Sequence, residues 1–154
     1  DDVAGAGKHA KAVEAFAKAR RSPSIAICGD LECELAAMGP DDRASFQADF
    51  GLTEVARPRL IQAVYSLLGL QTFFTAGEKE IKAWTIQKGD TGPVAAGKIH
   101  SDFEKGFVRA EVYSVDDLVQ HRTEAAIKSA GKLRVEGRDY VMRESDVCHF
   151  LVNR

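Results

Sequence analysis

The sequence has 154 residues, 45% of them hydrophobic and 29% charged, a composition typical of a globular protein with one domain or two small ones. Its 21 basic and 23 acidic residues nearly cancel, which excludes a general attraction to nucleic acid or to anionic membranes. No apolar run approaches the roughly 18 residues that span a bilayer, and no signal-type segment opens the chain. We therefore expect a cytoplasmic protein without membrane contact.

Helical patterns dominate the first part of the chain. Residues 8–20 contain strong helix formers and predict a helix, and further helices are expected over residues 29–38, 41–50 and 58–68. The apolar run 24–28 separates the first two helices and predicts a strand buried on both faces. Because nothing upstream in the chain can pair with this strand, we expect its neighbours to come from outside these residues.

The second part of the chain reads mainly as strands, so we place a domain boundary at Gly69. A hairpin is expected from strands 70–76 and 80–89, followed by a helix from residue 93 to about residue 102. The elements predicted next share this strand-rich pattern: strand 108–113, short helices 115–121 and 123–130, and strands 132–137 and 146–153. This order predicts a ubiquitin-like β-grasp over residues 70–154 and an α+β protein overall.

Strand 108–113 alternates cleanly between apolar and polar residues. Val108, Ala110 and Val112 are expected on the buried face, and Arg109 and Tyr113 on the outward face. On the last strand the outward residues should be Val147, His149 and Leu151.

A positive charge among rings, as Arg109, Tyr113 and His149 provide, suits contacts with single-stranded or ribosomal RNA. These three residues are our candidate partner-binding residues. An ordinary solvated sheet face fits the same residues, and both interpretations stay open.

Catalytic and metal-binding patterns are missing from the sequence. Gly5-Ala6-Gly7-Lys8 resembles the end of a phosphate loop, but His9 stands where serine or threonine is needed. The four histidines lack metal-ligand spacing, and the three cysteines form no CxxC pair. We therefore expect no catalytic residue and no metal site in this chain.

Longer stretches carry a family resemblance. The segments LQTFFTAGEKEIKAWTIQKG and AAGKIHSDFEKGFVRAEV, with EAAIKSAGKLRVEG later, resemble the C-terminal TGS domain of the YchF-type, Obg-like ATPases. ICGDLECEL is similar to the end of that family's nucleotide-binding domain. The resemblance implies that residues 1–69 are the end of a P-loop NTPase domain and residues 70–154 a TGS domain.

The family's known properties give further expectations. Cys28, Gly29, Asp30 and Leu31 resemble its base-binding loop, where backbone amides approach the base. The resemblance implies ATP or GTP with magnesium as the cofactor of the full-length protein, and the ribosome or ribosomal RNA as partner. The phosphate loop and the magnesium-binding residues belong to an N-terminal NTPase part that we expect to be missing, so this chain alone should not hydrolyse ATP.

The sequence departs from the family pattern at a few positions. The family usually has glycine where Ser145 stands and often a basic residue where Leu151 stands. Leu151 removes one positive charge from the expected binding face. This loss weakens the prediction that the last strand binds nucleic acid. A self-standing RNA- or ribosome-binding β-grasp module without nucleotide chemistry is the alternative function.

Overall fold

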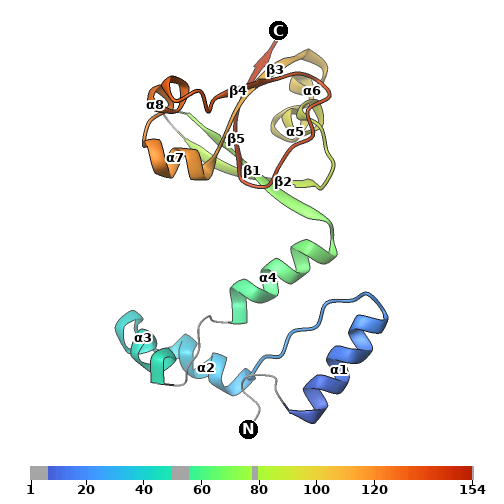
Figure 1. The fold of residues 1–154 in the computed structure, drawn as a ribbon, viewed down its shortest axis with the longest axis vertical. Helices are drawn as coiled ribbons and strands as arrows, with labels where there is room; N and C mark the ends of the chain where they lie inside the picture. Colours follow the sequence, from blue (N-terminus) through green and yellow to red (C-terminus); the bar gives the residue numbers. More distant parts are fainter. Residues whose placement is uncertain (1–6, 50–55, 78–79, 154) are drawn as a thin grey trace. The chain divides into compact units, whose positions relative to one another are not determined.

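The computed structural model describes residues 7–49, 56–77 and 80–153. The chain divides into two compact units, residues 1–68 and residues 69–154, and each has its own set of elements in Figure 1.

Helices make up the regular structure of the first unit. They are α1 (Lys8–Ala19), α2 (Gly29–Ala37), α3 (Pro40–Asp49) and α4 (Ala56–Leu67). These bounds confirm the four predicted helices, apart from residue 50, which lies outside the described residues. Leu31 and Leu35 on α2 are buried, and Glu32 Oε1 accepts a hydrogen bond of 2.8 Å from the backbone N–H of Ala56. This contact links the start of α4 to α2.

The strand predicted over residues 24–28 is wrong for the chain described here. Residues 22–28 carry no regular secondary structure, and Ile27 is exposed. The run has the composition of a buried strand, but no neighbouring strand pairs with it among the described residues. A strand needs such a partner to satisfy its backbone N–H and C=O groups.

The second unit is built on a five-stranded sheet of the described residues, with strand order β2-β1-β5-β3-β4. Its strands are β1 (Leu70–Ala76), β2 (Ile81–Gln87), β3 (Phe107–Ser114), β4 (Arg134–Glu136) and β5 (Asp146–Val152). β1 and β2 form the predicted antiparallel hairpin, while β1 and β5 run parallel and the other pairs antiparallel. This is the strand order of a β-grasp, so the predicted fold class is confirmed.

One face of the sheet is covered by α5 (Gly92–Ile99) and α6 (Ser101–Gly106), which replace the single helix predicted from residue 93 to about residue 102. His100 separates the two helices with extended backbone angles, φ −158° and ψ 139°. The core beneath them is apolar and includes Phe73, Ile86, Ala110, Val112 and Phe150.

The opposite face is covered at one end by α7 (Val115–His121) and α8 (Glu124–Ser129), on the other side of β5 in Figure 1. Ile127 is fully buried beneath them. A capping box starts α7: Ser114 and Asp117 each accept a hydrogen bond from the other's backbone N–H. The remainder of this face carries no helix in the described part of the unit.

The register of β3 is irregular at its start. The pairing of β3 with β5 shifts by one residue between Phe107 and Arg109. This shift is a β-bulge, and the extra residue, Val108, is exposed. The prediction that Val108 is buried with Ala110 and Val112 is therefore wrong at Val108 and confirmed at the other two positions.

Among the described helices, none has the length and apolar character needed to cross a membrane.

Candidate functional site

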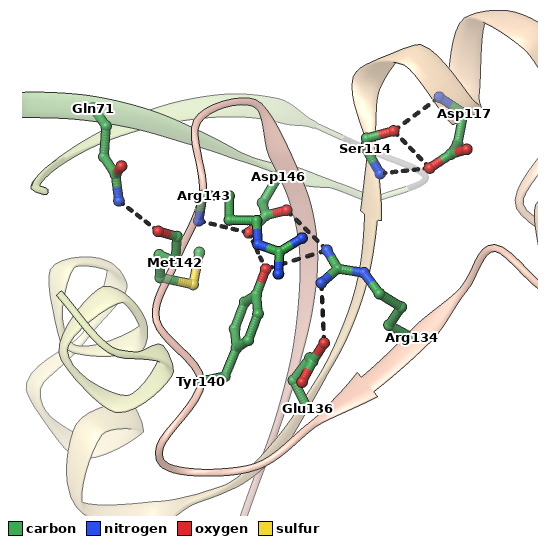
Figure 2. A network of polar contacts seen from close by, with 9 residues as sticks. All are labelled: Gln71, Ser114, Asp117, Arg134, Glu136, Tyr140, Met142, Arg143 and Asp146. Carbon is green, nitrogen blue, oxygen red and sulfur yellow. Dashed lines mark hydrogen bonds and ion pairs between the residues drawn. The ribbon is translucent and has the colours of Figure 1, made fainter. Parts of the chain in front are cut away.

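A buried carboxylate holds together the segment that leads into β5. Asp146 is 2% exposed and accepts hydrogen bonds from the Tyr140 hydroxyl at 2.7 Å, the Arg143 backbone N–H at 2.9 Å and the Arg134 guanidinium at 3.1 Å (Figure 2). Arg134 also donates to Glu136 at 3.0 Å. Burying a charged group is costly unless it is paired in this way.

The same contacts shift the pKa values of the network. Burial and the hydrogen bond to Asp146 raise the pKa of Tyr140 to about 12. Burial lowers the pKa of Arg134, but the Tyr140 hydroxyl and the two carboxylates outweigh it and raise the pKa overall. Arg134 therefore stays charged and Tyr140 stays neutral at physiological pH. The network supports the sheet and offers no group poised for proton transfer.

The helix-free part of the sheet carries a mixed set of side chains, which we call the open stripe. Strand pairing sets Glu111 opposite both Val135 and His149, and Arg109 opposite Leu151. Because paired residues and residues two apart on a strand share a face, these five side chains lie on one side of the sheet. The open stripe consists of Arg109, Glu111, Val135, His149 and Leu151.

Two of the three candidate partner-binding residues meet on the open stripe. Arg109 and His149 are both exposed and are diagonal neighbours across β3 and β5. Glu111 lies on the same face of β3 as Arg109, and its carboxylate is 3.8 Å from the His149 Nδ1 atom. The register of β3 against β5 brings these two together, and a single sequence does not supply that register. The stripe combines the positive charge of Arg109, the negative charge of Glu111 and the imidazole ring of His149.

The third candidate, Tyr113, is not on the open stripe. It is 6% exposed and packs with Ile127 and Val147 under α7 and α8, so its predicted outward position is wrong. Val147 is 3% exposed, and its predicted outward position is wrong for the same reason. Burial, with Glu124 and Cys148 nearby, raises the pKa of Tyr113. The alternation of β3 is as predicted here, but two short helices cover this end of the face.

Residues 28–31, the candidate base-binding loop, form the start of α2 in the first unit. Cys28 is the extended N-cap residue, and no side chain caps the helix. A side chain at Gly29 would meet open space, and the buried Leu31 anchors the turn. Exposed backbone N–H groups at the start of a helix can donate to an acceptor atom of a ligand.

The described residues contain no cluster of three or more histidine, cysteine, aspartate or glutamate side chains that could hold a metal ion. Cys148 is buried in the core of the second unit, and burial raises the pKa of its thiol. It is therefore an inert core residue.

Comparison with known proteins gives consistent matches. Residues 70–153 match the family model YchF-GTPase_C, described as "Protein of unknown function (DUF933)". A protein of Escherichia coli O157:H7 named "Ribosome-binding ATPase YchF" is 45% identical over 92% of this chain and 39% of its own length. The protein of the same name in Bacillus subtilis is 43% identical over 92% of this chain. "Obg-like ATPase 1" of Gallus gallus is 44% identical over 84% of this chain.

A solved structure agrees with these matches. The "Structure of the Schizosaccharomyces pombe YchF GTPase" aligns with 94% of this chain and 39% of its own, with a TM-score of 0.79 and 32% identity. The chain spans less than two fifths of the length of these relatives and matches their C-terminal part. Since the family model covers more than half of the chain, the chain belongs to the YchF-GTPase_C family.

Proposed function

We propose that this chain acts as the C-terminal part of a cytoplasmic, ribosome-associated, Obg-like ATPase. Its β-grasp unit, a TGS domain in this proposal, contacts the ribosome or ribosomal RNA. The observation that carries the proposal is the 45% identity, over 92% of this chain, to a protein named for ribosome binding and ATPase activity. The aligned region is long enough to include residues of both units and not the sheet alone.

The open stripe is the surface we assign to the ribosome contact. Arg109 supplies a positive charge for a phosphate group, and His149 supplies an exposed ring beside it. Glu111 makes the stripe less positive, so a contact here positions one strand and does not attract nucleic acid in general. Tyr113 does not contribute, because helices cover it.

Residues 28–31 are assigned to the nucleotide. The uncapped N-terminus of α2 offers backbone N–H groups to the base of ATP or GTP, and the open space at Gly29 lets the base approach. Magnesium and the phosphates belong, in this proposal, to the rest of the full-length ATPase. The chain by itself is then expected to hold no nucleotide cofactor and to show no turnover.

Cosedimentation of the chain with ribosomes through a sucrose cushion tests the ribosome contact. The wild type is expected in the ribosomal pellet, with binding that weakens as salt is raised. Arg109→Glu should bind several-fold more weakly and reduce the dependence of log affinity on log salt by about one. Lys128→Glu is the matched control, because Lys128 is exposed on α8 and does not belong to the open stripe.

The self-standing binding module remains the second candidate function. It is favoured by the β-grasp unit having a complete core of its own. If this candidate is right, the chain binds ribosomes equally well with and without ATP. The same holds for a fusion of the chain to the N-terminal part of a relative.

The cosedimentation test can also contradict the role of the open stripe. That outcome is equal amounts of the wild type and Arg109→Glu in the ribosomal pellet.

A further inference from the structure

A second surface of the β-grasp unit is hollowed, at the end of the sheet where α5, α6 and the end of β5 meet. The pocket has a volume of about 630 Å³. It lies on the described residues Ile99, His100, Asp102, Phe103, Val152 and Asn153. Volumes of about 300–1,000 Å³ are usual for small-ligand sites.

The break between α5 and α6 shapes the pocket. His100 leaves the helical conformation, and its side chain is 60% exposed. Its Nδ1 atom accepts the backbone N–H of Asp102 at 3.2 Å, which caps α6. The Asp102 carboxylate lies 3.5 Å from the same Nδ1 atom.

The floor and the rim of the pocket differ in character. Ile99, Phe103 and Val152 are partly buried and pack on the main core, so the floor is apolar and supported from below. The rim has the Asp102 carboxylate and the Asn153 carboxamide, and both residues are exposed. The apolar floor can take the flat face of a ring, and the polar rim can pair with groups on its edge.

Backbone contacts hold one side of the rim in place. The N–H of Asn153 donates to the Gly106 carbonyl at 2.8 Å. A Cβ atom at residue 106 would collide with the Asn153 carbonyl oxygen, so glycine permits this close approach. These contacts hold the backbone of Asn153 beside Gly106 before any ligand arrives.

We propose that this pocket receives one unpaired base of a single-stranded RNA. The His100 ring stacks on the base, and the Asn153 carboxamide and the Asp102 carboxylate meet the donors and acceptors on the base edge. Unpaired RNA bases are recognised by this combination of an exposed ring and polar edge contacts. Exposed Lys98 and Lys105, each one or two residues from a pocket residue in the chain, supply charge for the flanking phosphates.

The chemistry of the rim selects this occupant over an apolar peptide side chain. Such a side chain would cover the Asp102 carboxylate and the Asn153 amide without giving them hydrogen bonds, which costs free energy. A base satisfies both groups. The inference rests on the proposed contact with the ribosome or its RNA, but it names a different surface from the open stripe.

Fluorescence anisotropy with a short, labelled, single-stranded RNA tests the proposal on the full chain. The comparison RNA has the same backbone with abasic sites. His100→Asn is the decisive variant, because asparagine can still cap α6 but has no ring to stack. We expect it to weaken binding of the base-containing RNA about fivefold or more and to leave binding of the abasic RNA unchanged. His9→Asn, in the exposed helix α1, is the matched control and should bind as the wild type does.

Methyl NMR of the wild type gives an independent readout that needs no variant. The methyl resonances of Ile99 and Val152 should shift with the base-containing RNA and stay in place with the abasic RNA. The pocket proposal would be overturned if the methyl resonances of Ile99 and Val152 did not shift with the base-containing RNA. It would also be overturned if the wild type and His100→Asn bound that RNA with equal affinity. If Arg109→Glu weakens ribosome binding while His100→Asn binds RNA as the wild type does, the proposed function stands without the pocket. If the wild type stays out of the ribosomal pellet, the proposed function fails whatever the pocket does.

Discussion

Asp146 shows how one buried side chain can order a connection that has little regular structure. Its carboxylate accepts from Tyr140, Arg134 and the backbone of Arg143, so residues on both sides of the connection from β4 to β5 meet at one point (Figure 2). Because this carboxylate is almost fully buried, loss of any one donor leaves part of its charge uncompensated.

The Tyr140 hydroxyl gives a pH-dependent prediction at the scale of a residue. Its pKa is raised from 10.0 to about 12 in the folded protein, so the unfolded chain loses this proton at a lower pH than the folded chain. The stabilisation is then complete below pH 10 and is lost as the pH rises towards 12. The difference in unfolding free energy between the wild type and Tyr140→Phe should shrink over this range.

Urea denaturation of both proteins at a series of alkaline pH values measures this difference. The comparison cancels the titration of lysines and other groups that the two proteins share. At neutral pH, Tyr140→Phe should be less stable by about 2 kcal/mol, since the hydroxyl's hydrogen bond to the buried Asp146 carboxylate is lost together with the one it accepts from Arg134. A difference that stays constant up to the highest pH would contradict the shifted pKa.

At Ser145 the resemblance to the YchF-type family carries information about the backbone conformation. The YchF-type pattern usually has glycine here, and the backbone of Ser145 has a φ of 64°, in the left-handed region. Glycine adopts this conformation without strain, while serine does so at a cost. The sequence predicts a turn at residues 143–146, and the left-handed backbone of Ser145 explains why the family pattern has glycine there.

At the scale of elements, Gly106 joins α6, β3 and the end of β5. Replacing it by alanine should lower the unfolding free energy by about 1–3 kcal/mol, because the new Cβ would meet the backbone carbonyl oxygen of Asn153. A backbone atom cannot move aside as easily as the end of a side chain. Thermal or urea unfolding measures the loss.

Gly137→Ala is the control for this substitution. A Cβ at Gly137 would have no atom within 4 Å, so its effect should stay within about 0.5 kcal/mol. Equal stability of the two variants would show that the end of β5 can shift away from α6 at little cost.

The strands and helices of the β-grasp unit could be predicted because their patterns are local. The alternation in β3, the hairpin and the helices before Gly131 all depend on residues close in the sequence. The burial of Tyr113 could not be predicted, since it depends on where α7 and α8 pack after the chain turns back. The break at His100 is hidden for a similar reason, because helix-forming residues lie on both sides of it.

The candidate sites follow the same division. Arg109, Glu111 and His149 each stand at an outward position of an alternating strand, which the sequence predicts, while the contact between Glu111 and His149 depends on the strand register. The pocket around His100 requires residues from α5, α6 and β5 at once. No single segment of the sequence contains that signal.

At the scale of the whole molecule, the two units differ in how much core they contain. Among the described residues of the first unit, the buried hydrophobic side chains are Leu31, Leu35 and Ala56. The second unit buries two apolar clusters on opposite faces of its sheet. We therefore expect the second unit to be much the more stable of the two, since burial of apolar surface is the main stabilising contribution.

Amide hydrogen exchange on a dilute sample of the full chain measures this difference. The amides of Ile25 to Cys28 should exchange fast, because this stretch has no strand partner in the described chain. The amides of Ala110 and Val112 should exchange slowly, because β3 lies between β5 and β4 and both residues are fully buried.

The sample must be shown to be monomeric, because exposed Ile27, Leu60 and Val64 favour association of the first unit at high concentration. Strong protection of both segments in such a monomer would mean that residues 1–68 form a stable core of their own, against the burial seen in this unit.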